Sequence, residues 1–395
     1  MGKIRPGSTA HLLQLCLGYF SFYVIFGVAV KYFQGPVAQG LPGMNGMEFL
    51  VYSTAGSTVV ALFVCLGLRW YRLQSNRLVQ WGPLRFPSEW FYIVPSGMLT
   101  AIVIPTTTLM YSLPISVMVA MVIMRGSIIV VSRLVDTVQI RQGLLRKRVY
   151  REEDWAIVFA LLAVATTIFL APLRQAGGGK HFEFLHSKAA MGILGIYIVA
   201  YTLRIYIMNY YKNTRGKGVP YNNKGFFAVE QMSAFVTLVV VTLVLLALHI
   251  TPALPAGVGG VATQQAASPS PLELFQRAFH APHSAWGWAA FAGSSFGIVA
   301  FYSVFIFMFQ GRTATFAGLV NRLTSLVAGT TSTLVFHFVH RGPFPSLEDW
   351  LSLVFILIAV WFLSVAERKR MAELTGTGSD VAAGPGAHPS GTSRA

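Results

Sequence analysis

Residues 114–136 read PISVMVAMVIMRGSIIVVSRLVD, an apolar stretch with Arg125 near its middle. The stretch is long enough to cross a bilayer as one helix, and Pro114 is well placed to begin that helix. At 1.5 Å per residue, Arg125 then lies roughly 16 Å into a hydrocarbon layer about 30 Å thick. A cation at that depth costs about 3 kcal/mol on insertion scales, so it should face water or a partner. We therefore expect Arg125 to help form a binding site for an anion.

The composition of the whole chain is typical of a polytopic membrane protein. Of its 395 residues, 54% are hydrophobic and 11% are charged, whereas about 25% of the residues of a soluble domain are charged. The net charge of +16 would suggest nucleic acid as a partner of a soluble protein. Here the basic residues lie between apolar segments, where they control topology next to anionic lipid. The expected partner is therefore the lipid bilayer, and no nucleic acid.

The distribution of apolar residues predicts an all-α integral membrane fold with ten transmembrane helices. With the N-terminus in the cytoplasm, 21 Lys and Arg residues fall on the cytoplasmic side and 5 on the other side, as the positive-inside rule requires. Both termini are then cytoplasmic, and the bacterial inner membrane is the expected location, with an organelle membrane as the alternative. The ten segments cover residues 11–33, 47–68, 91–113, 114–135, 155–173, 189–210, 226–250, 286–308, 315–338 and 350–366.

A shared pattern in the two halves predicts an internal repeat. Arg125 precedes an EDW tripeptide at residues 153–155 by 28 residues, and Arg322 precedes a second EDW at residues 348–350 by 26 residues. This offset corresponds to two units of five helices. Because five is odd, the second unit enters the membrane from the opposite side, and inverted repeats of this kind are typical of secondary transporters. We therefore expect Arg125 and Arg322 to lie in one cavity near the midplane.

The domain boundaries follow from this repeat. Residues 1–173 form the first five-helix repeat and residues 189–366 the second, joined by an outer loop at 174–188. The second repeat contains a long outer loop, 251–285, whose first half is Pro/Ala/Gly-rich and whose second half predicts a short amphipathic helix at the membrane interface. The Gly/Ser-rich tail, 367–395, is expected to be cytoplasmic and disordered.

Ten helices in a five-plus-five inverted repeat, together with the run MRGSII at residues 124–129, resemble the drug/metabolite transporter superfamily. This superfamily includes EamA-type permeases and the nucleotide-sugar and triose-phosphate transporters. Its organic-phosphate members place basic residues on helices four and nine, which implicates Arg125 and Arg322 in substrate binding. Asn321 stands where those members tend to carry a second basic residue. Small multidrug members use a glutamate on the first helix, but residues 11–33 contain no acid.

Three further residues are candidates for substrate binding because of their positions on helices four, six and nine. Ser132 shares a helical face with Arg125, and Ser325 shares one with Arg322. Tyr201 could line the cavity or only pack against neighbouring helices.

Arg204 and Glu230 complete the set of candidate substrate-binding residues. Arg204 could contact the substrate or extend to the cytoplasmic surface. Glu230 could pair with an arginine, carry a coupling proton, or interact with the dipole of its own helix.

These patterns predict a secondary transporter of a small organic anion, such as a phosphorylated or nucleotide-linked metabolite, and not an enzyme. The chain has no P-loop signature, and His337 and His340 alone are too few for a zinc site, so neither a cofactor nor a metal is expected. The alternatives are an EamA-type permease for amino acids or other neutral metabolites, a membrane-embedded transferase, and a scaffold or receptor. A homodimer is also an open alternative.

Overall fold

The computed structural model describes residues 9–144 (except 74 and 76), 150–166, 187–248 (except 217, 218, 220 and 221), 269–307, 309 and 314–382. Three predicted connections lie largely or wholly outside these residues: the outer loop 174–188, the first half of the outer loop 251–285, and the tail beyond residue 382.

The described residues are almost entirely helical. Besides the α-helices they form a one-turn 3-10 helix, η1 (Val37–Gln39), and one antiparallel hairpin of strands β1 (Leu78–Trp81) and β2 (Leu84–Pro87). The α-helices are α1 (Thr9–Gln34), α2 (Gly46–Gly67), α3 (Trp90–Ser112), α4 (Val117–Arg141), α5 (Arg151–Ala165), α7 (Lys188–Asn213), α8 (Asn223–Ala247), α9 (Pro271–His280), α10 (Trp286–Phe307), α11 (Ala314–His340) and α12 (Leu347–Ala382).

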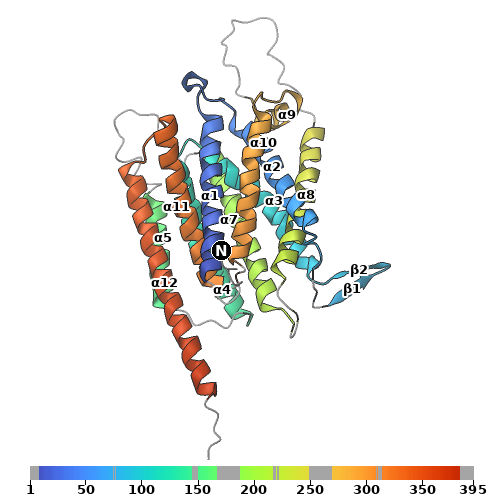
Figure 1. Ribbon diagram of the computed structural model, residues 1–395, viewed down its shortest axis with the longest axis vertical. Helices are drawn as coiled ribbons and strands as arrows, with labels where there is room; N and C mark the ends of the chain where they lie inside the picture. Colours follow the sequence, from blue (N-terminus) through green and yellow to red (C-terminus); the bar gives the residue numbers. More distant parts are fainter. Residues whose placement is uncertain are drawn as a thin grey trace, which may run out of the picture.

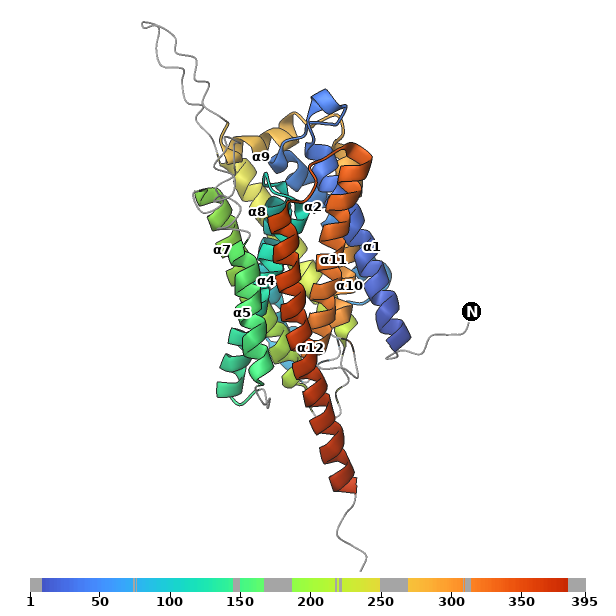
Figure 2. The ribbon, with the colours of Figure 1, turned by 90° about the vertical axis from the view of Figure 1, so that its left-hand side faces the viewer.

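The long helices lie side by side in one bundle (Figure 1). Helix α9 lies across one end of the bundle, which we call the α9 end, and the β1–β2 hairpin projects sideways at the opposite end, which we call the hairpin end. Figure 2 shows α12 continuing past the bundle at the hairpin end. Residues 367–382, which the sequence predicted to be disordered, are therefore the last turns of a helix in the structure.

Within the described residues, eight helices are long and apolar enough to cross a membrane: α1, α2, α3, α4, α7, α8, α10 and α12. They coincide with eight of the ten segments that the sequence predicted. The other two predicted segments, 155–173 and 315–338, overlap α5 and α11. Helix α5 has 15 described residues, which is too few to span a bilayer on their own. Helix α11 carries Asn321, Arg322 and many Ser and Thr residues, and it is not among the eight candidate spans.

The boundary between α3 and α4 differs from the prediction by a few residues. Helix α4 begins at Val117 and not at Pro114, because Ser116 takes the N-cap position and accepts a hydrogen bond from the Val119 amide at 3.1 Å. Pro114 lies in the connection before this cap. Arg125 is consequently eight residues, about 12 Å, from the start of its helix.

Two elements between the long helices contrast in how well the sequence anticipated them. The short helix predicted in the second half of the loop 251–285 is α9, which begins with Ser270 as its N-cap and Pro271 as its first residue. The β1–β2 hairpin was not predicted. It turns at Gly82, whose φ of 60° is in the left-handed region.

The helices of the two halves pack on each other in a reciprocal way. Helix α3 packs against α7 and α8, while α10 packs against α1 and α2. Helix α4 packs against α5, α7 and α11. In the same way, α11 packs against α12, α1 and α4. Helices α5 and α12, one from each half, pack along each other. The contact between α2 and α10 is very close, since a Cβ atom on Gly293 would be 2.2 Å from the backbone oxygen of Ser53. Small residues at such a crossing allow two backbones to approach each other.

Candidate functional site

Arg125 lies on α4 with only 6% of its surface exposed. Its Nη2 atom donates hydrogen bonds to the hydroxyl oxygens of Tyr23, at 3.1 Å, and Tyr19, at 3.4 Å. The guanidinium also lies 5.9 Å from the centre of the Tyr23 ring, within the range of a cation–π interaction. The Nε atom of Arg125 is buried and has no hydrogen-bond partner in the described part of the chain. The guanidinium therefore has donor capacity that the protein leaves unused.

Arg125 faces a cavity of about 60 Å³ at the centre of the bundle, which we call the tyrosine cavity. Aromatic and hydroxyl side chains dominate its wall. Tyr23 is fixed there by a 2.7 Å hydrogen bond to the Tyr111 hydroxyl, and Tyr111 in turn contacts the sulfur of Met121 at 3.1 Å. The polar lining residues are Tyr19, Tyr23, Thr100, Thr107, Arg125, Tyr197, Tyr201, Arg204, Gln231 and Ser303.

Asn321 holds Tyr19 in place from the other half of the chain. Its Oδ1 atom accepts a hydrogen bond from the Tyr19 hydroxyl at 3.5 Å, and its Nδ2 atom donates to Ser303 at 3.2 Å. Because Tyr19 also accepts from Arg125, the three side chains form a buried chain of hydrogen bonds from α11 through α1 to α4. Asn321 therefore acts on the Arg125 site through Tyr19.

Arg204 and Glu230 form a buried ion pair at the edge of the tyrosine cavity. The Nε and Nη2 atoms of Arg204 donate to the two carboxylate oxygens of Glu230 at 2.8 Å and 2.9 Å. Ser96 donates a third hydrogen bond to this carboxylate at 2.7 Å. The alternative that Arg204 extends to the cytoplasmic surface is therefore wrong, because its charge is matched inside the bundle.

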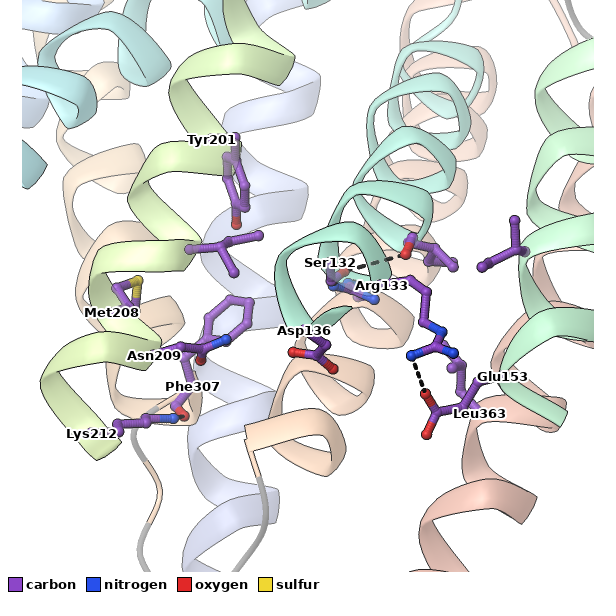
Figure 3. A pocket seen from close by; sticks show the side chains of 14 residues that line it. Ser132, Arg133, Asp136, Glu153, Tyr201, Met208, Asn209, Lys212, Phe307 and Leu363 are labelled. Atoms are coloured by element: carbon purple, nitrogen blue, oxygen red, sulfur yellow. Dashed lines mark hydrogen bonds and ion pairs between the residues drawn. The ribbon is translucent and has the colours of Figure 1, made fainter. Parts of the chain in front are cut away.

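Arg322 faces a second cavity, of about 70 Å³, which we call the vestibule. Its Nη2 atom donates a hydrogen bond to the Ser132 hydroxyl across the contact between α11 and α4, and its buried Nε atom has no partner among the described residues. Figure 3 shows the vestibule between α4 and α7. Its polar lining residues are Ser132, Arg133, Asp136, Glu153, Tyr201, Asn209, Lys212 and Arg322.

The sequence predicted that Arg125 and Arg322 share one cavity, but in the structure they line two different cavities. Arg125 lines the tyrosine cavity and Arg322 lines the vestibule, whereas Tyr201 lines both. Tyr201 is 6% exposed, and its ring lies 5.4 Å from that of Tyr197. The phenol side chain of Tyr201 thus separates the two cavities.

Ser325 is completely buried beside this site but is used locally. Its hydroxyl donates to the backbone oxygen of Arg322, one turn earlier in α11, at 2.8 Å. Ser325 appears in the lining of neither cavity. Like Asn321, it therefore lies behind the cavity wall, next to Tyr19, whose hydroxyl its own side chain hydrogen-bonds.

A group of ion pairs closes the side of the vestibule near α5 and α12. Arg133 lies 3.8 Å from a carboxylate oxygen of Glu153, and Arg370 donates to the same carboxylate at 2.6 Å. Figure 3 shows the Arg133–Glu153 pair. At the start of α5, Lys369 donates to the Glu152 carboxylate and holds the pKa of that group below its usual range. These pairs fasten α12 to α5 at the hairpin end.

Neither Arg125 nor Arg322 forms a salt bridge with an acid in the described part of the chain. Among the described residues, no carboxylate oxygen lies within 4.0 Å of a guanidinium nitrogen of Arg125 or Arg322. A buried cation without a carboxylate is costly, and hydroxyl oxygens compensate it only in part. The described residues also contain no group of three or more His, Cys, Asp and Glu side chains that could hold a metal ion.

Two half-buried lysines occupy related places at opposite ends of the bundle. Near the α9 end, Lys31 of α1 donates to the backbone oxygen of Leu113, just after α3, at 3.0 Å. Near the hairpin end, Lys212 of α7 donates to the backbone oxygen of Phe307, the last residue of α10. The last carbonyls of a helix have no hydrogen-bond partner within that helix, so each lysine supplies a hydrogen bond to a carbonyl that the helix itself leaves without one.

The sequence contained a signal for the tyrosine cavity that the arginine pattern alone does not give. A Tyr-x-x-x-Tyr pair occurs in α1, at Tyr19 and Tyr23, and again in α7, at Tyr197 and Tyr201. Residues four apart share one helical face, so each pair points to the same side of its helix. All four tyrosines line the tyrosine cavity.

Comparisons with known proteins give no family. No protein-family model matches the chain, and no curated protein matches it. One solved structure, described only as "Crystal structure of protein", aligns with 92% of this chain and 99% of its own length, at 15% sequence identity and a TM-score of 0.48. A likeness of that size says nothing about function.

Proposed function

We propose that the chain is a secondary transporter that moves a small organic anion across the membrane. The observation that carries this proposal is the buried guanidinium of Arg125, which faces a hydroxyl-lined cavity with no carboxylate among the described residues within salt-bridge distance. An anion that enters this cavity gains a charge-assisted hydrogen bond from the unused Nε atom and further bonds from tyrosine hydroxyls. Carboxylate and phosphate oxygens fit the two-pronged guanidinium best.

Ten transmembrane helices in two inverted repeats are part of the same proposal. The first tyrosine of the α1 pair is 178 residues before the first of the α7 pair, and the second tyrosines have the same separation. Similarly, α11 begins 197 residues after α4, which is also the separation of Arg322 from Arg125. The reciprocal packing of α3 and α10 and the two lysine bonds at opposite ends support the same symmetry.

The two halves differ in one respect that supports alternating access. Between α4 and α7 the vestibule leads from Tyr201 toward Lys212, at the hairpin end of α7. At the α9 end, the equivalent helices α1 and α11 are tightly packed: a Cβ atom on Gly27 would lie 2.5 Å from the Ser332 hydroxyl, which donates to the Val24 backbone oxygen at 3.3 Å. This asymmetry is what we expect of a transporter state that is open toward the hairpin end. In the opposite state, α1 and α11 would separate at the α9 end, and α4 and α7 would pack tightly at the hairpin end.

The charge distribution supports a cytoplasmic hairpin end. This end carries the basic residues of the connection between α2 and α3, together with Arg141 in the last turn of α4. Both termini would then be cytoplasmic, and a bacterial inner membrane remains the proposed location. The resemblance to the drug/metabolite transporter superfamily remains part of the proposal as well.

One observation favours a second candidate, a permease for neutral metabolites. Arg125 already donates to Tyr19 and Tyr23, so its guanidinium could serve only to hold α1 against α4. In that case the hydroxyls and the Gln231 amide would bind an uncharged polar substrate.

A thermal-shift experiment separates these two functions. The purified protein is heated with anionic, neutral and cationic metabolites, alongside Arg125→Ala and a control variant, Arg85→Ala, on the exposed strand β2. A ligand at a hundredfold excess over its Kd stabilises the folded state by about 2.7 kcal/mol. We expect phosphorylated or carboxylated compounds to raise the midpoint of the parent and of Arg85→Ala but not of Arg125→Ala. Stabilisation by neutral compounds alone, or an equal response of Arg125→Ala, would instead favour the neutral permease.

A further inference from the structure

A third cavity, of about 700 Å³, lies away from both arginines, between α2, α8 and α10 and beneath α9. We call it the α9 groove. Its size is within the range of about 300–1,000 Å³ that is usual for ligand sites. Its walls are almost entirely apolar and include Leu50 and Val51 from α2, Leu238 and Leu245 from α8, and Phe275 and Trp286 above them.

The few polar groups around the α9 groove are mostly used within the protein. The Tyr52 hydroxyl donates to the backbone oxygen of Ala278 at 2.9 Å, and the Thr58 hydroxyl donates to that of Thr54 at 2.6 Å. The Thr54 hydroxyl is buried and has no hydrogen-bond partner among the described residues. A buried water needs two to four polar partners, and one free hydroxyl does not supply them. The occupant of the groove should therefore be a hydrocarbon.

Helix α9 is fixed over the groove as a roof. The Tyr52 bond to Ala278 ties α9 to α2, and the Gln276 side chain donates to the backbone oxygens of Leu245 and Leu248, at 2.8 Å each, where α8 ends. Because these bonds hold α9 above the cavity, its own side chains line the roof and do not fill the space.

The α9 groove continues onto a lipid-facing surface. The groove residues Val239, Val241 and Leu243 are 40–61% exposed, and next to them on α8 lie Val236 and Val244, which are exposed to a similar extent. An apolar surface on a membrane-spanning helix faces acyl chains, so the groove opens into hydrocarbon.

We propose that the α9 groove binds an acyl chain of a bilayer phospholipid, whose headgroup lies beside α9. Helix α9 has an exposed arginine, Arg277, and the exposed His280 at the end of the bundle. A basic side chain at this depth attracts a lipid phosphate. The site is distinct from the anion site at Arg125, because the α9 groove shares no lining residue with the tyrosine cavity.

The test uses the full chain in vesicles of phosphatidylethanolamine and phosphatidylglycerol. A trace of the phosphatidylethanolamine carries a photoactivatable diazirine in the middle of one acyl chain, and mass spectrometry maps the positions where it attaches. We expect attachment to concentrate on the groove residues Val51, Leu238 and Phe279, above the level at the outward-facing Val236 and Val244.

Two variants fill the groove from opposite walls, Thr242→Trp on α8 and Ala55→Trp on α2. Displacing even two methylene groups weakens chain binding about tenfold, so both variants should lower attachment in the groove about tenfold. The control is Val240→Trp, which adds the same bulk to α8 outside the groove lining. The proposal would be overturned if attachment in the groove were no higher than attachment on the outward face of α8. It would also be overturned if both filling variants left attachment in the groove unchanged, or if the groove were never labelled because another part of the chain covers it.

Discussion

The guanidinium of Arg204 and the carboxylate of Glu230 meet through two hydrogen bonds, of 2.8 Å and 2.9 Å, with both side chains buried inside the bundle. One charge from α7 is thus cancelled by one from α8, and Ser96 of α3 adds a hydrogen bond to the carboxylate. Three helices are joined at this point, beside the tyrosine cavity but without a free charge for a substrate.

Removing one partner of this pair should destabilise the protein strongly. An isolated buried charge left behind by Glu230→Ala costs about 3–5 kcal/mol, which unfolding of the detergent-purified protein by heat or denaturant would measure. The double variant Arg204→Met with Glu230→Leu leaves no unpaired charge and should recover most of the loss. If the single variant were as stable as the parent, the pair would not be a structural tie.

Tyr19→Phe should weaken anion binding without unfolding the protein. The substitution removes the hydroxyl that connects Arg125 with Asn321 and keeps the ring in place. A lost hydrogen bond of this type is worth about 0.5–1.5 kcal/mol, so the Kd of the stabilising anion should rise several-fold in a binding titration. Tyr32→Phe, farther along the same helix and outside the tyrosine cavity, is the matched control. Equal affinities for the two variants would remove Tyr19 from the site.

Gly293→Ala should lower stability although alanine favours helices. A Cβ atom at this position would lie 2.2–2.6 Å from backbone atoms of Ser53, which cannot move away without separating α10 from α2. Gly287 lies on the same helix, and no described atom beyond its own stretch of chain lies within 4 Å of its would-be Cβ. Gly287→Ala should therefore be neutral or gain up to about 1 kcal/mol. A melting temperature unchanged in both variants would contradict the close α2–α10 packing.

Lys31→Met should open the α9 end of the bundle more often. The substitution removes the bond from α1 to the Leu113 carbonyl, and a hydrogen bond to a charged donor is worth about 1.5–3 kcal/mol. Opening can be measured in a variant in which Cys16 and Cys65 are replaced and the buried Ser332 is changed to Cys. The rate at which a water-soluble maleimide labels this cysteine reports how often the α9 end opens. We expect that rate to rise about tenfold or more. The exposed Lys188→Met serves as the control, and no change in labelling would separate Lys31 from the closure of this end.

The sequence was sufficient for the helices because hydrophobic length is a local property. Each of the ten apolar segments overlaps a helix within the described residues, and most boundaries differ by a few residues: α4 begins after the Ser116 cap instead of at Pro114. The exception is α12, which continues to Ala382, well beyond the predicted end at 366. The β1–β2 hairpin was missed because each strand has only four residues, which is too short for an alternating pattern to stand out.

The site was predictable only in part, because its geometry depends on contacts between distant helices. Arg125 was found as a charge in the middle of an apolar segment. The pairing of Arg204 with Glu230 depends on how α7 faces α8, and nothing in either segment alone specifies it. Likewise, the separation of the two arginines depends on the position of Tyr201, a residue that sequence reasoning could not distinguish from ordinary aromatic packing.

The unmatched charge of Arg125 has an electrical consequence for the proposed transporter. With no acid in salt-bridge range among the described residues, the empty site is positive, and a bound monoanion makes it neutral. The membrane potential then changes the free-energy difference between the two orientations of the empty carrier, by up to about 2.3 kcal/mol per charge for each 100 mV. The corresponding difference for the loaded, neutral carrier is almost unaffected. An inside-negative potential would hold the empty site toward the cytoplasm, so that loading there and outward movement of the anion are favoured.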